Sequence, residues 1–204
     1  ELIKGSLNTF LNAFTYPDKT CYPVASQNVQ DFYNLIDVYL DAVLYPNLTR
    51  HTFEQEGWHY ELDSLDDAMA FKGVVFNEMK GAYSTPEEVL AQQSQSIVFP
   101  DNTYFQDSGG DPRAIPDLTY EAFKAFHQKH YHPSNAFIYF YGDDAPEKRL
   151  EIVDAYLRDF DRVSVDSAVL MQPRYNQPRR AQQSYEVTPD EEAPKAMLTV
   201  NWLL

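Results

Sequence analysis

Segments with helical periodicity alternate along this chain with short runs of β-forming residues, and this alternation restricts the fold class. Apolar side chains repeat at helical spacing over residues 32–43, with Asn28 expected to cap the helix and Pro46 to stop it. Helices interspersed with hairpin-like strands predict an α+β fold. Short strands are expected at residues 9–15, 20–24, 58–62 and 135–141.

Start signals predict three further helices. Thr85 and Pro86 combine a capping side chain with a proline at the first helical position, and this helix is expected to reach about Ile97. Thr119 is expected to cap the next helix. The third opens near Pro146 and has an apolar face made of Leu150, Val153, Tyr156, Leu157 and Phe160.

Residues 71–84 allow two interpretations. Val74, Val75 and Phe76 favour a strand, whereas residues 77–80 suit a helix. Glu78 stands among apolar residues, so we expect its carboxylate to be partly buried. A buried carboxylate needs a cation, backbone donors or a metal as a partner.

Composition excludes several classes of function. The net charge is −15, whereas a phosphate-binding surface needs clustered Lys and Arg, so we expect no nucleic acid partner. The apolar runs are all far shorter than the roughly 18 residues that a membrane span requires. Cys21 is the single cysteine, which excludes an internal disulfide and a cysteine-rich zinc site.

The histidines form no recognisable metal motif. The run that begins at His51 and Glu54 starts like a zinc helix, but Gln55 stands where the second imidazole is needed. His127, His130 and His132 are closely spaced near the end of a predicted helix. These three suit either a metal site or favourable interaction with the helix dipole.

Several long strings of the sequence, in order, closely resemble the presequence protease family, which are large zinc peptidases of the pitrilysin and insulysin superfamily. The strings extend over almost the whole chain, at residues 7–24, 53–62, 73–81, 108–112, 131–135 and 200–204. The resemblance implies a domain like those of pitrilysin and mitochondrial processing peptidase, with an antiparallel-rich sheet packed with helices. We expect a domain truncated at both ends.

The same resemblance implies domain boundaries. Residues 1–165 would form most of the first peptidase domain. The proline-interrupted residues 166–195 would be a linker, and residues 196–204 would begin a second, similar domain. Because the chain lacks an initiator methionine and stops inside a strand-like run, we interpret it as a segment of a longer protein.

The family's zinc is held by two histidines of a His-x-x-Glu-His helix and by a later glutamate, which matches Glu78. The glutamate inside the motif is the general base, and the resemblance places this motif shortly before Glu1. Asn77 and Lys80 flank Glu78 without an assigned role. The segment alone is therefore expected neither to hold zinc nor to cleave peptides, because a catalytic zinc usually has three protein ligands.

Residues Asn12, Ala13, Phe14 and Thr15 match the family strand that runs along the bound peptide. A free strand edge can pair with an extended substrate through main-chain hydrogen bonds. The other interpretation is an ordinary core strand.

The function implied for the longer protein is a metalloendopeptidase for unfolded peptides such as targeting presequences. Its partners would be those peptides and the remaining domains of the same chain, with no nucleic acid and no membrane. The alternative is a non-catalytic member of the superfamily that binds peptides or serves a structural role. Relatives occur in bacterial cytoplasm, mitochondrial matrix and plastid stroma, and the sequence does not choose among these compartments.

Overall fold

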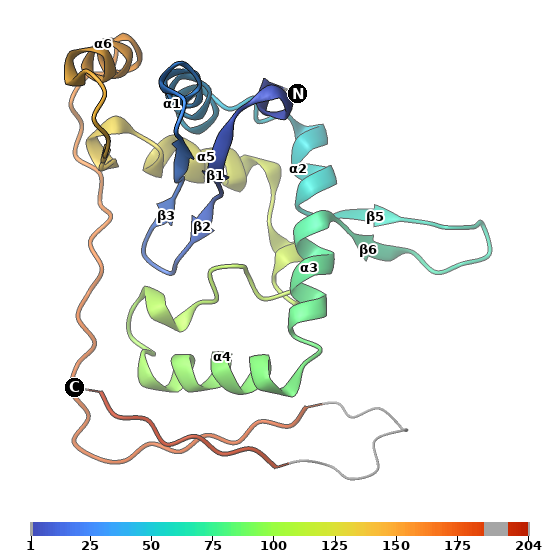
Figure 1. Cartoon of the computed structure of the whole chain (residues 1–204). Helices are drawn as coiled ribbons and strands as arrows, with labels where there is room; N and C mark the ends of the chain where they lie inside the picture. The colour runs from blue at the N-terminus through green and yellow to red at the C-terminus, as the bar shows by residue number, and fades with distance from the viewer. Residues whose placement is uncertain (1, 186–195, 204) are drawn as a thin grey trace. The chain divides into compact units, whose positions relative to one another are not determined.

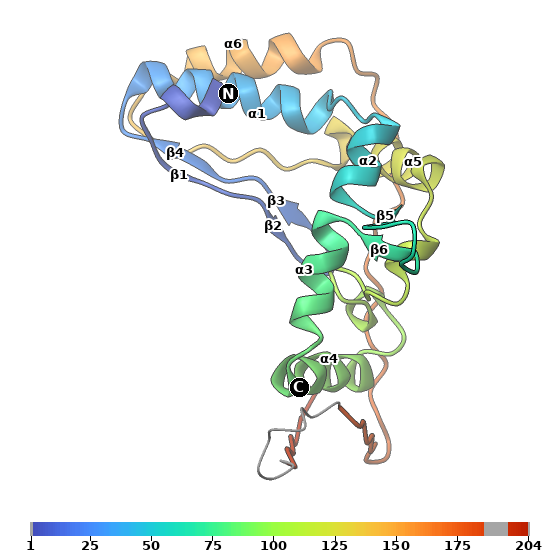
Figure 2. The ribbon, with the colours of Figure 1, turned by 90° about the vertical axis from the view of Figure 1, so that its right-hand side faces the viewer.

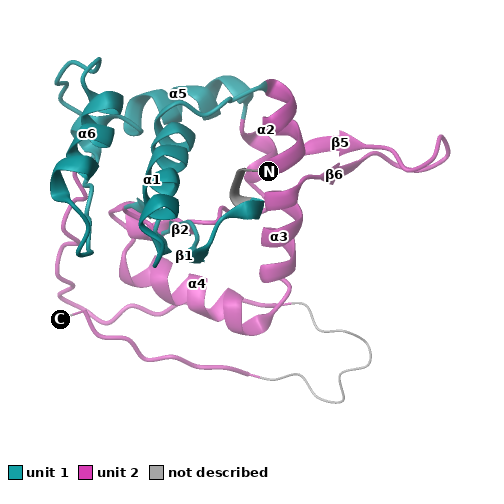
Figure 3. Ribbon diagram, turned by 45° about the horizontal axis from the view of Figure 1, so that its top comes forward, with its two compact units in different colours: residues 1–15, 19–49, 119–167 teal, residues 16–18, 50–118, 168–204 magenta. Residues whose placement is uncertain are grey.

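A computed structural model describes residues 2–185 and 196–203 of the chain (Figure 1). Helices dominate, and the strands are short and antiparallel, which confirms the expected α+β class. No helix in the described part is long and apolar enough to cross a membrane. The chain divides into two compact units, which are coloured separately in Figure 3: residues 1–15, 19–49 and 119–167 form unit 1, and residues 16–18, 50–118 and 168–204 form unit 2.

Unit 1 contains two short antiparallel strand pairs and three α-helices. Its elements are η1 (Leu2–Gly5), β1 (Asn8–Leu11), β2 (Phe14–Thr15), β3 (Thr20–Cys21), β4 (Val24–Ser26), α1 (Val29–Leu44), α5 (Tyr120–His130), η4 (Pro133–Asn135) and α6 (Pro146–Leu157), where η denotes a 3₁₀ turn. β1 pairs with β4, and β2 pairs with β3. Between the two pairs the Asn12 amide donates to the Pro23 carbonyl at 3.1 Å, so the ribbon continues through residue 12.

Helix α1 forms the centre of unit 1. Leu35 and Ile36 are its buried residues, and the helix packs against β4 and α6 (Figure 2). The Tyr156 hydroxyl of α6 donates to the Asp37 carboxylate at 2.8 Å and joins the two helices. Asn28 caps α1 as predicted, because its side-chain oxygen accepts the Asp31 amide at 3.0 Å.

Among its described residues, unit 2 contains the third antiparallel strand pair and three α-helices. Its elements are α2 (Arg50–Glu56), β5 (His59–Glu61), β6 (Ala70–Lys72), α3 (Val74–Ala82), α4 (Pro86–Val98), η2 (Thr103–Phe105) and η3 (Ile115–Asp117). Phe53, Phe76 and Ile115 are its buried apolar residues. Thr85 caps α4 through the Glu88 amide, as its start signal predicts. Of the two interpretations of residues 71–84, the helix is right from Val74 onward: Val74, Val75 and Phe76 are helical, and the strand β6 ends at Lys72.

Three expectations about these elements are wrong. The predicted strand at residues 135–141 is not formed: beyond η4 the chain has no strand partner within the described residues, and β-forming residues need a neighbouring strand to pack against. Residues 196–203 likewise form no strand. Leu150 is 65% exposed, because the buried stripe of α6 includes Arg149 in its place.

The part of the chain after α6 contains no helix or strand within the described residues. Residues 168–185 run without helix or strand, and residues 186–195 of the predicted linker lie outside the described residues. In unit 2 the Tyr175 hydroxyl donates to the Val98 carbonyl at 2.7 Å. The Gln172 amide donates to the Asp101 carboxylate at 2.6 Å, so this segment is attached to the end of α4. The proposed domain boundaries remain a prediction.

Candidate functional site

Helix α3 carries Glu78 and is positioned by a glycine. Gly73 precedes the helix with φ of +146°, in the region that favours glycine. A Cβ atom at Gly73 would collide with the Gly57 carbonyl oxygen and would lie 2.7 Å from the Trp58 Cα atom. The Phe76 amide then donates to the Gly57 carbonyl at 3.3 Å. The start of α3 is thereby placed directly on the chain segment between α2 and β5.

Glu78 is exposed, so the expectation that its carboxylate would be partly buried is wrong. Phe76 is the buried residue of α3 and Met79 is half-buried, and residue 78 lies about 200° around the helix from residue 76 at 3.6 residues per turn. The flanking Asn77 and Lys80 are exposed as well. A carboxylate on this face is free to bind a ligand without first leaving a packed environment.

The described residues contain no group of three His, Cys, Asp or Glu side chains arranged to hold a metal. Glu78 therefore stands as one candidate ligand. Its carboxylate chemistry fits zinc, which accepts Asp and Glu oxygens, but a complete site needs further donors.

The closely spaced histidines have structural contacts within unit 1. His127 Nε2 lies 2.9 Å from the Val43 carbonyl oxygen, and its ring stacks on Tyr131 at 4.5 Å between centroids. His132 Nδ1 accepts the Ser134 amide at 3.1 Å and caps η4. The His130 ring packs on Phe126. These contacts favour a structural role for the three histidines over a metal site.

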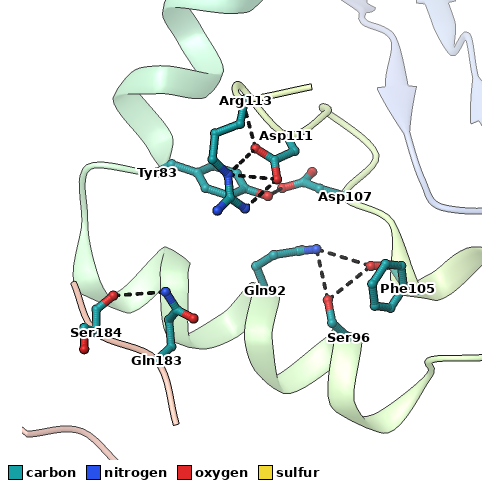
Figure 4. A network of polar contacts seen from close by, with 9 residues as sticks. All are labelled: Tyr83, Gln92, Ser96, Phe105, Asp107, Asp111, Arg113, Gln183 and Ser184. Carbon is teal, nitrogen blue, oxygen red and sulfur yellow. Dashed lines mark hydrogen bonds and ion pairs between the residues drawn. The ribbon is translucent and has the colours of Figure 1, made fainter. Parts of the chain in front are cut away.

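A polar network connects Tyr83, at the end of α3, to the loop of residues 107–113 (Figure 4). The Tyr83 hydroxyl donates to the Asp107 carboxylate at 3.0 Å, and Asp107 also accepts the Gly109 amide at 2.8 Å. Burial and the neighbouring Asp107 carboxylate raise the pKa of Tyr83 above its ordinary value. Hydrogen bonds from Arg113 hold the pKa of Asp111 below its usual range. The network fixes residues 107–113, and Gly109 of this loop lies against Met79 of α3.

Residues 12–15 all have exposed side chains. Phe14 is opposite Cys21 and Thr15 is opposite Thr20, whereas Ala13 lies between the two strand pairs. The Ala13 amide donates to the Asn12 side-chain oxygen at 2.8 Å. Within the described residues, β1 and β2 each pair with one strand, so their second edges have no strand neighbour.

Sequence reasoning missed Gly73, Gly57 and the Tyr83–Asp107 pair. A glycine that lies between a strand-like run and a helical run is a weak signal for a special backbone conformation, and the sequence carries this signal at Gly73. The Tyr83–Asp107 hydrogen bond joins residues 24 positions apart and left no local signal.

Comparison with known proteins gives a consistent result. The family model described as "Peptidase M16 inactive domain" matches residues 117–204. Over 100% of the chain, identity is 54% with presequence protease 1, chloroplastic/mitochondrial, of Arabidopsis thaliana and 49% with protein HypA of Clostridium perfringens. Identity is 44%, again over 100% of the chain, with the mitochondrial presequence protease of Xenopus laevis. The chain covers 19%, 21% and 20% of these three relatives, so it spans about a fifth of their length. This chain therefore belongs to the presequence protease family of the M16 peptidases.

Proposed function

We propose that this chain is part of a zinc-dependent metalloendopeptidase that degrades unfolded peptides such as targeting presequences. The observation that carries the proposal is its 54% identity, over its whole length, with a presequence protease. Since the relatives are about five times as long, the activity is proposed for the longer polypeptide that contains this chain, called the parent protein below.

Glu78 is proposed as the third zinc ligand of the parent protein. Support comes from its match to the family glutamate and from its exposed position on α3, opposite the buried Phe76. The two histidine ligands and the general base are proposed to come from a His-x-x-Glu-His motif outside this chain. When bound, zinc supplies an acidified water and polarises a carbonyl. The chain on its own is proposed to be inactive, because it offers one ligand.

Residues 12–15 are proposed to bind the peptide substrate as an added strand. Their exposed side chains and the second edge of the ribbon, which has no strand neighbour in the described part, support this role over that of a core strand. Main-chain pairing is suited to substrates of varied sequence, because it uses groups that every residue carries.

The proposed partners are unfolded peptides and the remaining domains of the parent protein. Targeting peptides are rich in arginine and poor in acidic residues, which suits a chain with a net charge of −15. Exposed apolar residues such as Phe137 and Tyr141 are available for contacts with those domains. The compartment stays open among bacterial cytoplasm, mitochondrial matrix and plastid stroma, and the relatives include chloroplastic, mitochondrial and bacterial proteins.

The test is a Glu78→Gln substitution in the parent protein, with bound zinc measured by elemental analysis and turnover measured on an unfolded peptide. Glutamine keeps the size of the side chain and removes the charge that binds the metal. We expect loss of most of the zinc and a fall in turnover of about a hundredfold or more. Glu87→Gln, at an exposed glutamate of α4, is the matched control and should leave both values unchanged.

Two outcomes would contradict the proposal. Unchanged zinc content and turnover in the Glu78→Gln variant would remove Glu78 from the site. A wild-type parent protein that binds peptides but holds no zinc and cleaves nothing would instead be a non-catalytic member of the family.

A further inference from the structure

The β5–β6 hairpin of unit 2 presents an apolar face that the unit does not cover. The hairpin projects from the junction of α2 and α3 (Figure 1). Tyr60 lies opposite Phe71 in the strand pair, which ends at Glu61 and Ala70. The exposed Leu62 and Met69 are the next residues beyond these two ends. Tyr60 is 59% exposed, Met69 is 69% exposed, and Leu65 in the connecting loop is 95% exposed. We call the set Tyr60, Leu62, Leu65, Met69 and Phe71 the hairpin face.

The polar side chains on the opposite side of the hairpin already have partners within the hairpin. His59 Nε2 lies 3.3 Å from one Glu61 carboxylate oxygen, and Lys72 Nζ lies 3.6 Å from the other. Glu61 thus contacts both His59 and Lys72. The two sides of the ribbon therefore differ: the polar side is internally paired, and the apolar side is open to a partner.

The base of the hairpin is held firmly. The Trp58 indole N–H donates to the Leu118 carbonyl at 2.9 Å. The Trp58 and Phe71 rings are 5.8 Å apart between centroids, and Phe71 and the buried Phe76 are 5.9 Å apart. A two-stranded ribbon is marginally stable alone, so these contacts keep the hairpin face in a defined position.

The loop beside the hairpin face is acidic. Asp63, Asp66 and Asp67 lie in the connection between β5 and β6, and none of them forms an ion pair within the described part of the chain. Exposed apolar residues bordered by polar ones mark interaction surfaces. Here the bordering loop residues are acidic, so they favour a partner that carries positive charge.

We propose that the hairpin face docks a basic amphipathic peptide, whose apolar residues cover Leu65 and Met69 and whose Lys or Arg side chains meet Asp66 and Asp67. A second copy of the chain fits poorly, because two acidic loops on chains of net charge −15 would repel each other. The inference concerns binding and requires neither zinc nor Glu78. Only the further step, that the docked peptide is a substrate, rests on the proposed function.

The test measures binding of a fluorescein-labelled amphipathic peptide of leucine and lysine to the 204-residue chain by fluorescence anisotropy. The Leu65→Ser/Met69→Ser double variant should weaken binding by about tenfold or more, because two exposed apolar anchors are lost. The matched apolar control is Leu150→Ser, at a leucine that is 65% exposed in unit 1, and it should change affinity by less than about twofold.

The charge contribution is tested separately. Asp66→Asn/Asp67→Asn should weaken binding by about threefold to tenfold and reduce its salt dependence. Glu87→Gln/Glu88→Gln removes the same charge from the first turn of α4 and should have a smaller effect. A peptide with glutamate in place of lysine should not bind.

Several results would overturn the proposal. The first is equal affinity of the wild type and the Leu65→Ser/Met69→Ser variant, and the second is equal binding of the glutamate peptide. A wild-type dimer that this variant converts to a monomer would assign the face to self-association. Hydrogen exchange protection of residues 60–71 in the peptide-free parent protein, beyond that in the chain alone, would assign it to another domain. Glu78→Gln should leave peptide binding intact, which separates this inference from the zinc proposal.

Discussion

Gly73 lies so close to the backbone of Gly57 that a Cβ atom at residue 73 would collide with the Gly57 carbonyl oxygen. The obstacle is backbone, so a larger residue cannot be accommodated by a side-chain rotation. Gly73 also has a φ of +146°, which L residues with side chains rarely adopt. The attachment of α3 to the rest of unit 2 therefore depends on a glycine at this position.

Gly73→Ala is expected to lower the melting temperature strongly, by about 10 °C or more, because it combines a collision with an unfavourable backbone conformation. Gly81→Ala is the matched control, since Gly81 lies within α3 and a Cβ atom there meets nothing within 4 Å. That variant should be neutral or slightly stabilising. Thermal melting followed by circular dichroism compares the two, and equal melting temperatures would contradict the assigned role of Gly73.

A buried ion pair predicts a pH-dependent stability. Arg149 Nη2 lies 2.8 Å from the Asp144 carboxylate, and both side chains are almost fully buried. Burial alone would raise the pKa of Asp144, but hydrogen bonds from Arg149 and Tyr33 outweigh it and hold the pKa below the usual range. A carboxyl with a lowered native pKa contributes stability above its unfolded pKa of about 3.9 and loses it as pH falls through the native value.

Arg149→Met should therefore lower the melting temperature at neutral pH by about 10 °C, because Asp144 is left buried without its cation. The difference from the wild type should shrink as the pH falls through the lowered pKa of Asp144, because the carboxyl then becomes neutral and no longer needs the cation. Arg158→Met is the control at the C-cap of the same helix, since the pair of Arg158 with Asp154 is largely exposed. A difference between wild type and Arg149→Met that stays constant from pH 7 to pH 3 would rule out this linkage.

The proposed peptide-binding strand is tested by Ala13→Pro in the parent protein. Residue 13 lies outside both strand registers, so proline removes a main-chain donor while the pairs that include Phe10 and Phe14 remain. The Michaelis constant for an unfolded peptide should rise several-fold with little change in kcat. If residues 12–15 are an ordinary core strand, the melting temperature should fall and the Michaelis constant should stay the same.

Much of the local structure could be predicted from short stretches of sequence. Asn28, Thr85 and Thr119 cap the helices that their spacing indicated, because a capping hydrogen bond joins residues three positions apart. The short strand near Trp58 was also predictable from its composition. The family resemblance came from longer strings in order, and the comparisons confirm it.

The candidate site was less predictable. Glu78 could be selected by resemblance, but its exposure depends on which face of α3 packs against the rest of unit 2. Leu150 matched the apolar period of α6, yet the buried position went to Arg149 because Asp144 provides a partner for its charge. The predicted strand at 135–141 failed since a strand exists only with a neighbour to bond.

The sequence by itself determined the helix boundaries with side-chain caps, the α+β class and the family, because these depend on neighbouring residues or on ordered strings. Tertiary structure alone decided that Glu78 faces outward, that Gly73 packs on Gly57, and that the Tyr83 hydroxyl meets Asp107. It also left the hairpin face uncovered in unit 2. Each of these depends on contacts between segments separated along the chain, and no local pattern encodes them.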